Sequence, residues 1–168
     1  MNKKTQTITL TALFTALTCI STYLLKIPSF GPNGYIHLGD AFVIISGILL
    51  GPLYGTFAAG AGSALADAFG GYVMYVPATF IIKALIAATA YFIFYKLTFP
   101  IKNNYIKCAI AGIFSAIIMV SGYFIYEYIL YDGNGAFAGI IGNTIQGLSG
   151  IVISTLLLPK ILKIKNRG

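Results

Sequence analysis

Residues 35–83 decide how this chain folds, and they read YIHLGDAFVIISGILLGPLYGTFAAGAGSALADAFGGYVMYVPATFIIK. The stretch is apolar enough to lie in lipid, but it carries four ionisable side chains: His37, Asp40, Asp67 and Lys83. Such groups are costly in bilayer-spanning segments and are usually kept there for a function. We therefore expect the functional site to lie within or beside this stretch.

Composition places the 168-residue chain among proteins that cross the membrane several times. Hydrophobic residues make up 58% of the sequence and charged residues 9%, and the mean hydropathy is +0.86. Backbone polar groups in lipid must be paired inside helices or a closed barrel, and the apolar runs are too long and unalternating for barrel strands. The composition therefore predicts an all-α bundle in the lipid bilayer, formed by a single domain over residues 1–168.

Breaks between the apolar runs predict six transmembrane helices. Within the quoted stretch, Gly51-Pro52 separates two arms, and Gly70-Gly71-Tyr72 precedes the next span. The expected spans are residues 8–25, 39–50, 53–69, 75–97, 106–131 and 137–162. The second span is short, about 12 residues or roughly 18 Å, so it requires tilt or local thinning of the bilayer.

The cationic residues favour this six-span topology. Six spans place on one side Lys3, Lys4, Lys96, Lys102, Lys107, Lys160, Lys163, Lys165 and Arg167, with Lys26 on the other. Five spans would place every cationic loop after Lys26 outside. The positive-inside rule therefore predicts six spans with both termini in the cytoplasm. Topology also explains the net charge of +7 better than nucleic-acid binding does, because the lysines follow no single polar face.

Polar and aromatic side chains converge on the outer end of this predicted bundle. The candidate substrate-binding residues are His37, Asp40, Asp67, Tyr72, Tyr75, Thr79, Lys83, Tyr123, Glu127, Asn143 and Gln146, with Tyr35 and Tyr126 as further aromatic walls. The inner halves of the spans contain almost no polar residues. We therefore predict a water-accessible pocket that opens outward.

Structural roles for the same residues stay open. Lys83 either contacts a ligand or neutralises Asp67 or Glu127. Asp40 either binds substrate or caps the start of its helix. The two amides of the last span suit hydrogen bonds between helices as well as ligand contacts, and the tyrosines also suit an interfacial belt.

Little in the sequence supports catalysis or metal binding. No Walker A, HExxH or GxGxxG pattern is present. His37 is the only histidine, and the two cysteines have no metal-ligand spacing, so we expect neither a metal nor a cofactor. Residues 147–150, GLSG, resemble the GxSG of rhomboid intramembrane proteases, but Ser149 would lie roughly 18 Å deeper than His37. We therefore expect no catalytic residue and no enzyme activity.

Five short motifs in the first half of the chain carry a resemblance. They are HLGD (37–40), GILLGPLYG (47–55), GSALAD (62–67), GGY (70–72) and PATFIIK (77–83). With them the chain resembles the substrate-binding S components of energy-coupling factor (ECF) vitamin transporters, most closely the riboflavin-type branch. The resemblance implies capture of a vitamin or vitamin precursor at the outer face of a bacterial-type cell membrane.

The same resemblance implies protein partners. ALFTA (12–16) matches the family's AxxxA motif, so Ala12 and Ala16 would meet a transmembrane T component that works with two ATPases. ATP would then be used by the partner subunits only. The motifs do not select one ligand among riboflavin, pyridoxine, hydroxymethylpyrimidine, cobalamin and other vitamins. The alternatives are a self-sufficient small transporter or channel and a rhomboid-like protease.

Overall fold

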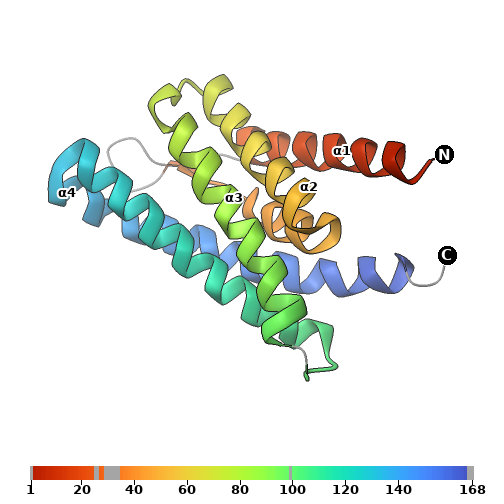
Figure 1. Ribbon diagram of the computed structural model, residues 1–168. Helices are drawn as coiled ribbons and strands as arrows, with labels where there is room; N and C mark the ends of the chain where they lie inside the picture. The colour runs from red at the N-terminus through yellow and green to blue at the C-terminus, as the bar shows by residue number, and fades with distance from the viewer. Residues whose placement is uncertain (1, 25–26, 29–34, 99, 166–168) are drawn as a thin grey trace.

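The computed structural model describes residues 2–24, 27–28, 35–98 and 100–165, without the side chains of residues 27, 28, 35, 36, 132, 134 and 165. Its elements are α1 (Lys3–Leu24), β1 (Ile27–Pro28), β2 (Tyr35–Ile36), α2 (Asp40–Phe69), η1 (Val73–Tyr75), α3 (Val76–Phe92), η2 (Ile93–Leu97) and α4 (Asn104–Lys165). The two short strands pair antiparallel. Apart from them the described elements are helical, as predicted (Figure 1). Outside the description lie Leu25, Lys26, Arg167 and the side chains of Tyr35 and Lys165.

α2 bends sharply at the predicted break. Gly51 has φ 86° and ψ −179°, a conformation that is open essentially to glycine only, and Pro52 follows without a backbone N–H. The Ser46 hydroxyl donates to the carbonyl oxygen of Gly55 at 3.3 Å, although nine residues would separate them by roughly 13.5 Å in a straight helix. α2 therefore consists of two arms, residues 40–50 and 52–69, that turn back on each other.

α4 also folds back on itself. Figure 1 shows its ribbon running to one end of the molecule and returning toward the C-terminus. Ile151 packs so closely on Gly112 that a Cβ placed on the glycine would lie 2.9 Å from the isoleucine side chain. Because these residues are far apart in the sequence, the two arms of α4 lie side by side in opposite directions.

Five helices are long and apolar enough to cross a membrane, among the residues that the structure describes. They are Lys3–Leu24, Asp40–Phe69, Val73–Leu97, Asn104–Tyr131 and Gly135–Ile164, and they overlap the predicted spans. Apart from Gly39, which is the N-cap, both predicted spans 39–50 and 53–69 fall within α2. The chain is therefore a multi-pass membrane protein.

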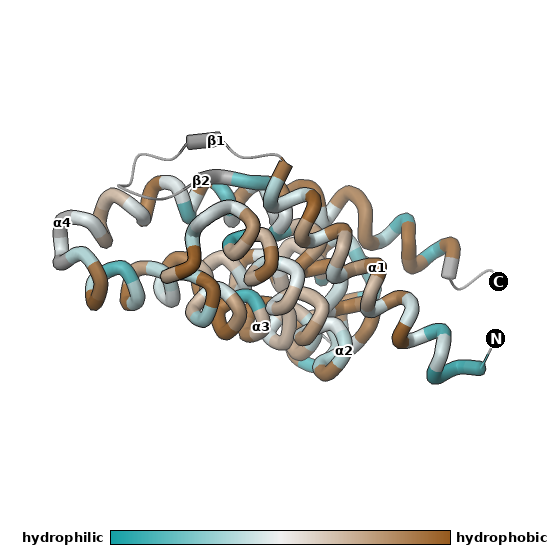
Figure 2. The backbone as a smooth tube through the Cα atoms, turned by 90° about the horizontal axis from the view of Figure 1, so that it is seen from above, coloured by the Kyte–Doolittle hydropathy of each residue, from teal (hydrophilic) through white to brown (hydrophobic). Residues whose placement is uncertain are grey.

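The bundle is apolar outside and partly polar inside. Large apolar side chains such as Leu53, Phe69 and Ile129 are exposed, and Figure 2 shows hydrophobic residues along the outer sides of the helices. Several polar side chains are instead buried: Thr18, Thr22, His37, Asp40, Ser63, Asp67, Thr79, Lys83, Glu127 and Gln146. This distribution suits a protein whose solvent is lipid and whose interior holds the functional groups.

Candidate functional site

A small polar cavity lies inside the helix bundle. It is lined by Thr22, His37, Ser63, Asp67, Tyr75, Thr79, Tyr123, Glu127, Asn143 and Gln146, and its volume is about 50 Å³. The lining comes from α1, α2, η1, α3, both arms of α4 and the segment before α2. The structure thus brings together eight of the eleven candidate substrate-binding residues, whose role in binding stays a prediction. The other three, Asp40, Tyr72 and Lys83, are not part of this lining.

Lys83 lies below the surface in an ion pair with Asp40. Its Nζ is 2.5 Å from Asp40 Oδ1, 3.3 Å from Met119 Sδ and 5.4 Å from the centre of the Tyr123 ring. The lysine is 0% exposed, so its charge requires a partner within the protein. The Lys83 pairing predicted with Asp67 or Glu127 is therefore wrong.

Asp40 does not cap α2 as the sequence suggested. The N-cap position belongs to Gly39, and no side chain makes a cap hydrogen bond there. Asp40 is the first residue of the helix, and its carboxylate neutralises the buried ammonium of Lys83. The ion pair explains why the Asp40 side chain points toward Lys83 and not toward the helix N-terminus, because an unpaired buried charge would cost several kcal/mol.

His37 connects the start of α2 to α4. Its backbone N–H donates to Gln146 Oε1 at 3.3 Å, and its Nδ1 accepts from the Gly39 N–H at 3.0 Å. Nδ1 also lies 3.9 Å from Asp40 Oδ2. Gln146 Nε2 in turn lies 3.5 Å from Met119 Sδ. Gln146 therefore combines hydrogen bonds between elements with a place on the cavity wall.

Tyrosines form much of the remaining wall. Tyr123 donates its hydroxyl to Thr79 Oγ1 at 3.0 Å, and Tyr75 donates to Glu127 Oε1 at 3.4 Å. The Tyr75 ring packs against Tyr126 and Tyr131, with centroid distances of 5.6 and 6.4 Å.

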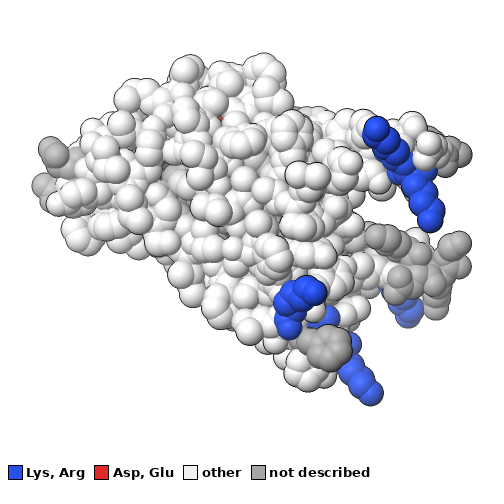
Figure 3. Space-filling view, viewed as in Figure 1, with Lys and Arg blue, Asp and Glu red and all other residues white. Residues whose placement is uncertain are grey.

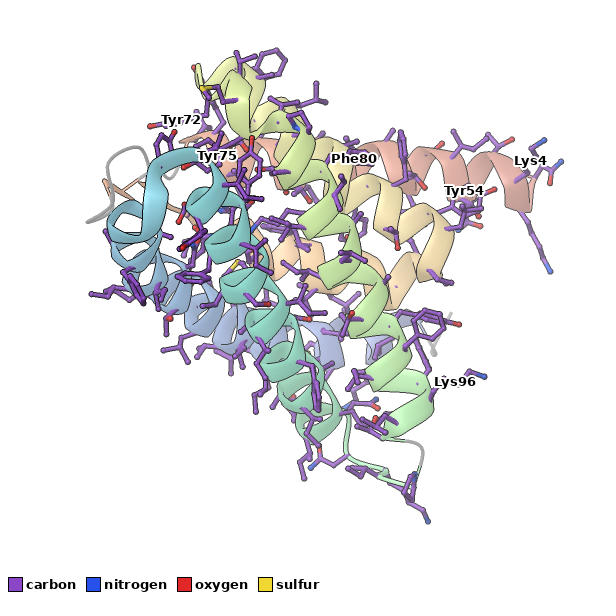
Figure 4. All side chains as sticks on the ribbon, turned by 60° about the vertical axis from the view of Figure 1, so that its left-hand side comes forward. Lys4, Tyr54, Tyr72, Tyr75, Phe80 and Lys96 are labelled. Carbon is purple, nitrogen blue, oxygen red and sulfur yellow. The ribbon has the colours of Figure 1, made fainter. Side chains whose placement is uncertain are left out.

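The tyrosine end of the bundle lies opposite its cationic end. Figure 4 places Tyr72 and Tyr75 together at one end of the bundle, and Lys4 and Lys96 toward the other. Tyr72 is half-buried against the hydrophobic core, which includes Tyr75 and Tyr123, and it occupies the N-cap position of η1. The polar cavity therefore lies toward the end of the bundle away from Lys4.

Three polar atoms of the lining have no hydrogen-bond partner in the described part of the chain. They are Thr22 Oγ1, Ser63 Oγ and Glu127 Oε2, all of them buried. Buried polar atoms are normally paired with protein or water. These three atoms are therefore suited to bind a polar ligand.

Thr22 and Ser63 were not expected at the site. Both are small hydroxyl residues within apolar runs, where such side chains are commonly used for close helix packing. One signal was present for Ser63, which lies four residues before Asp67 and so shares its helical face.

The cavity has the groups for binding but shows no catalytic or metal-binding set. Ser149 donates to the carbonyl oxygen of Gln146 at 2.7 Å within its own helix and is not part of the lining. No cluster of three potential metal ligands occurs among the described residues. Hydrogen bonding and aromatic contact are the chemistry that the cavity offers.

Ala12 and Ala16 lie on a separate surface. Both are exposed, and they line an apolar groove of about 740 Å³ between α1 and the second arm of α2. The groove is lined by Ile8, Thr11, Ala12, Thr15, Ala16, Cys19, Ile20, Leu53, Tyr54, Phe57 and Leu65. The two alanines lower the helix surface where a second helix would approach.

Comparisons with known proteins agree on one class of membrane protein. The family model described as ECF-type riboflavin transporter, S component, matches residues 2–163. The thiamine precursor transporter HmpT of Lactococcus lactis subsp. cremoris is 30% identical over 162 residues, which cover 95% of this chain and 90% of HmpT. An uncharacterized protein of Pyrococcus woesei is 36% identical over 134 residues, which cover 80% of this chain and 86% of the relative.

A solved structure shares the fold. It is the S component for biotin from an ECF-type ABC transporter, with a TM-score of 0.68 and 23% identity, covering 100% of this chain and 96% of that one. The family match extends over nearly the whole sequence, and the resemblance carried by the five motifs is thereby confirmed. The chain belongs to the family of ECF-type riboflavin transporter S components, which are substrate-binding transporter subunits and not enzymes.

Proposed function

We propose that this chain captures a vitamin or vitamin precursor in the polar cavity, from the outer face of a bacterial-type cell membrane. The observation that carries the proposal is the convergence of ten lining residues, three of them with unpartnered polar atoms, inside an apolar bundle. Burying such groups in lipid without a use is costly. A ligand that supplies the missing hydrogen bonds explains why they are there.

A six-span topology with cytoplasmic termini is part of this proposal. Figure 1 shows both termini at the same end of the molecule, which supports an even number of crossings. The reversal at Gly51 supplies the sixth crossing by splitting α2 into two arms. In Figure 3 the visible lysines lie toward the end of the termini and along the lower edge. The positive-inside rule supports a cytoplasmic position for this end.

The partners of the proposed subunit are a T component and two ATPases. The groove beside Ala12 and Ala16 offers an apolar surface between two helices, which suits a transmembrane partner that inserts its own helix. The chain carries no nucleotide-binding motif, so ATP is used by the ATPases only and this single domain, residues 1–168, needs no cofactor of its own.

The ligand has to separate the walls of the cavity. A volume of about 50 Å³ is well below the roughly 300–1,000 Å³ of ordinary small-molecule pockets. The names of the relatives support a ligand of vitamin size, since they refer to riboflavin, a thiamine precursor and biotin. The tyrosine walls favour one that is partly aromatic.

Reconstitution tests the proposal. Liposomes that contain this chain with a T component and two ATPases should take up vitamin only when ATP is inside, and the chain should co-purify with the ATPases. Uptake by liposomes that contain the chain without partners would instead indicate a self-sufficient transporter. Cleavage of a membrane peptide that depends on Ser149 would indicate a protease.

A further inference from the structure

We propose that the cavity selects a neutral or cationic heteroaromatic ring that carries an exocyclic amino group, and that it rejects vitamins that carry a carboxylate. The inference rests on the proposed function, because it names the ligand class of the same cavity. It is carried by the charges and the unpartnered atoms of the lining.

The charged groups of the lining favour an amine over a carboxylate. Asp67 and Glu127 are the acidic residues of the cavity, and no described lysine or arginine lines it. Lys83 is nearby, but its charge is paired with Asp40 at 2.5 Å and neither side chain belongs to the lining. His37 also lines the cavity, but its Nδ1 accepts a hydrogen bond from the Gly39 N–H, as in a neutral imidazole. A ligand carboxylate would therefore meet two acidic side chains in apolar surroundings and no lysine or arginine, which opposes binding.

Glu127 offers the anchor for the amino group. Its Oε1 accepts the weak bond from Tyr75 at 3.4 Å, whereas Oε2 is buried and makes no hydrogen bond within the described residues. A buried carboxylate oxygen requires a donor. An aminopyrimidine edge can donate to this oxygen, whereas the imide edge of a flavin puts a carbonyl on either side of its one N–H. The carboxylate therefore favours the amino ring over the flavin.

The surroundings of Glu127 suit a flat ring. Tyr75 stands beside it, with Tyr126 and Tyr131 packed against the Tyr75 ring, and aromatic faces favour offset or edge-on contacts with a further ring. The unpartnered hydroxyls of Thr22 and Ser63 can both donate and accept. They therefore match ring nitrogens or a hydroxymethyl group on the same ligand.

A competition experiment tests the ligand class. The full-length chain, purified in mild detergent, is incubated with an equimolar mixture of 4-amino-5-hydroxymethyl-2-methylpyrimidine, thiamine, riboflavin, biotin, pantothenate and nicotinate. Bound compounds are identified by mass spectrometry. We expect retention of the aminopyrimidine, thiamine or both, and of no carboxylate. Retention of a carboxylate vitamin, of riboflavin alone, or of nothing in the mixture would overturn the inference.

Paired changes in protein and ligand test the anchor. Glu127→Gln should weaken binding of the retained amino compound at least tenfold, while Ser149→Ala, which lies outside the cavity, should leave it unchanged. An analogue with oxygen in place of the exocyclic amine should bind wild type weakly, because its carbonyl and the Glu127 carboxylate are both acceptors. It should bind Glu127→Gln no more weakly than wild type, because the glutamine amide can donate to the carbonyl. Equal affinity of wild type and folded Glu127→Gln for the amino compound would overturn the anchor.

Two further measurements keep the outcomes separate. If Glu127→Gln does not fold, Tyr75→Phe removes the neighbouring hydroxyl instead and should weaken binding of the amino compound severalfold, with the exposed Tyr128→Phe as control; equal affinity of the two variants would overturn the anchor. Co-purification with the ATPases is measured on the same preparations. Loss of the predicted selectivity with co-purification intact refutes only the ligand class, whereas loss of both refutes the proposed function.

Discussion

Lys83 Nζ and Asp40 Oδ1 lie 2.5 Å apart in the interior and join α3 to the first turn of α2. Neither side chain lines the polar cavity. The pair therefore links two helices outside the cavity lining. Because Lys83 is paired with Asp40, it does not neutralise the acidic residues of the lining. Met119 Sδ at 3.3 Å from the ammonium connects the pair to α4 as well.

Breaking this pair should destabilise the protein more than removing it. Lys83→Met leaves the Asp40 carboxylate buried without its partner, which typically costs about 3–5 kcal/mol. Adding Asp40→Asn removes that charge, so the double variant should recover much of the loss. Unfolding followed in detergent measures both. Additive losses in the double variant would show that the two residues do not act as a pair.

The bend of α2 should depend on the backbone of Gly51. Alanine there would have to adopt φ 86°, which costs on the order of 1–3 kcal/mol. Gly51→Ala should therefore lower the unfolding temperature. Gly133→Ala is the matched control, because the nearest side-chain atom to an added Cβ, on Tyr128, is 3.5 Å away. Equal unfolding temperatures for the two variants would contradict a role for the Gly51 conformation.

The groove on α1 should mediate docking and not ligand binding. Ala12→Leu or Ala16→Leu would fill the floor of the groove and should reduce ATP-driven uptake and co-purification with the T component. Ligand affinity of the isolated chain should stay within about twofold, because neither alanine touches the cavity. Ala68→Leu, an exposed alanine outside the groove, is the control. A parallel loss of affinity and docking would point to misfolding instead.

Reporter fusions test the topology. Fusions after Lys102 and Gly168 should report from the cytoplasm, and a reporter inserted at Gly71 should report from outside. With five crossings and a cytoplasmic N-terminus, the fusions after Lys102 and Gly168 would both report from outside, and the insertion at Gly71 would report from the cytoplasm. An outside signal after Lys102 would move the cavity to the cytoplasmic face and refute capture from outside.

The sequence predicted that most of the candidate polar residues share one end of the bundle, but it did not predict which neighbours each side chain faces. Gly51-Pro52 predicted the bend because glycine can adopt a positive φ and proline lacks a backbone N–H, and both effects depend only on the local sequence. The partner of Lys83 was a different problem, since Asp40, Asp67 and Glu127 all belong to the same end of the bundle. Choosing among them requires knowing which way each helix face turns, and that is set by tertiary packing.

Thr22 and Ser63 escaped prediction for a related reason. A hydroxyl residue on a helix face of small residues is usually interpreted as a helix-packing residue. Only the folded structure shows whether its side chain contacts a neighbouring helix or lines a cavity. The two-residue strands β1 and β2 were also missed, because they are too short to show an alternating pattern. What was missed therefore depends on contacts between distant segments.

Substitutions at two unpartnered hydroxyls of α1 distinguish an effect on ligand binding from an effect on stability. Thr18 and Thr22 lie four residues apart, both buried and both without a hydrogen-bond partner in the described chain, but only Thr22 lines the cavity. Replacing either by valine, which has the same shape, removes an unpaired hydroxyl and should leave stability unchanged or raise it by up to about 1 kcal/mol. Thr22→Val should in addition weaken ligand binding about 2- to 10-fold, the worth of one ordinary hydrogen bond, while Thr18→Val should not. Calorimetric titration of both variants with the same vitamin measures the difference, and equal affinities would show that the Thr22 hydroxyl does not reach the ligand.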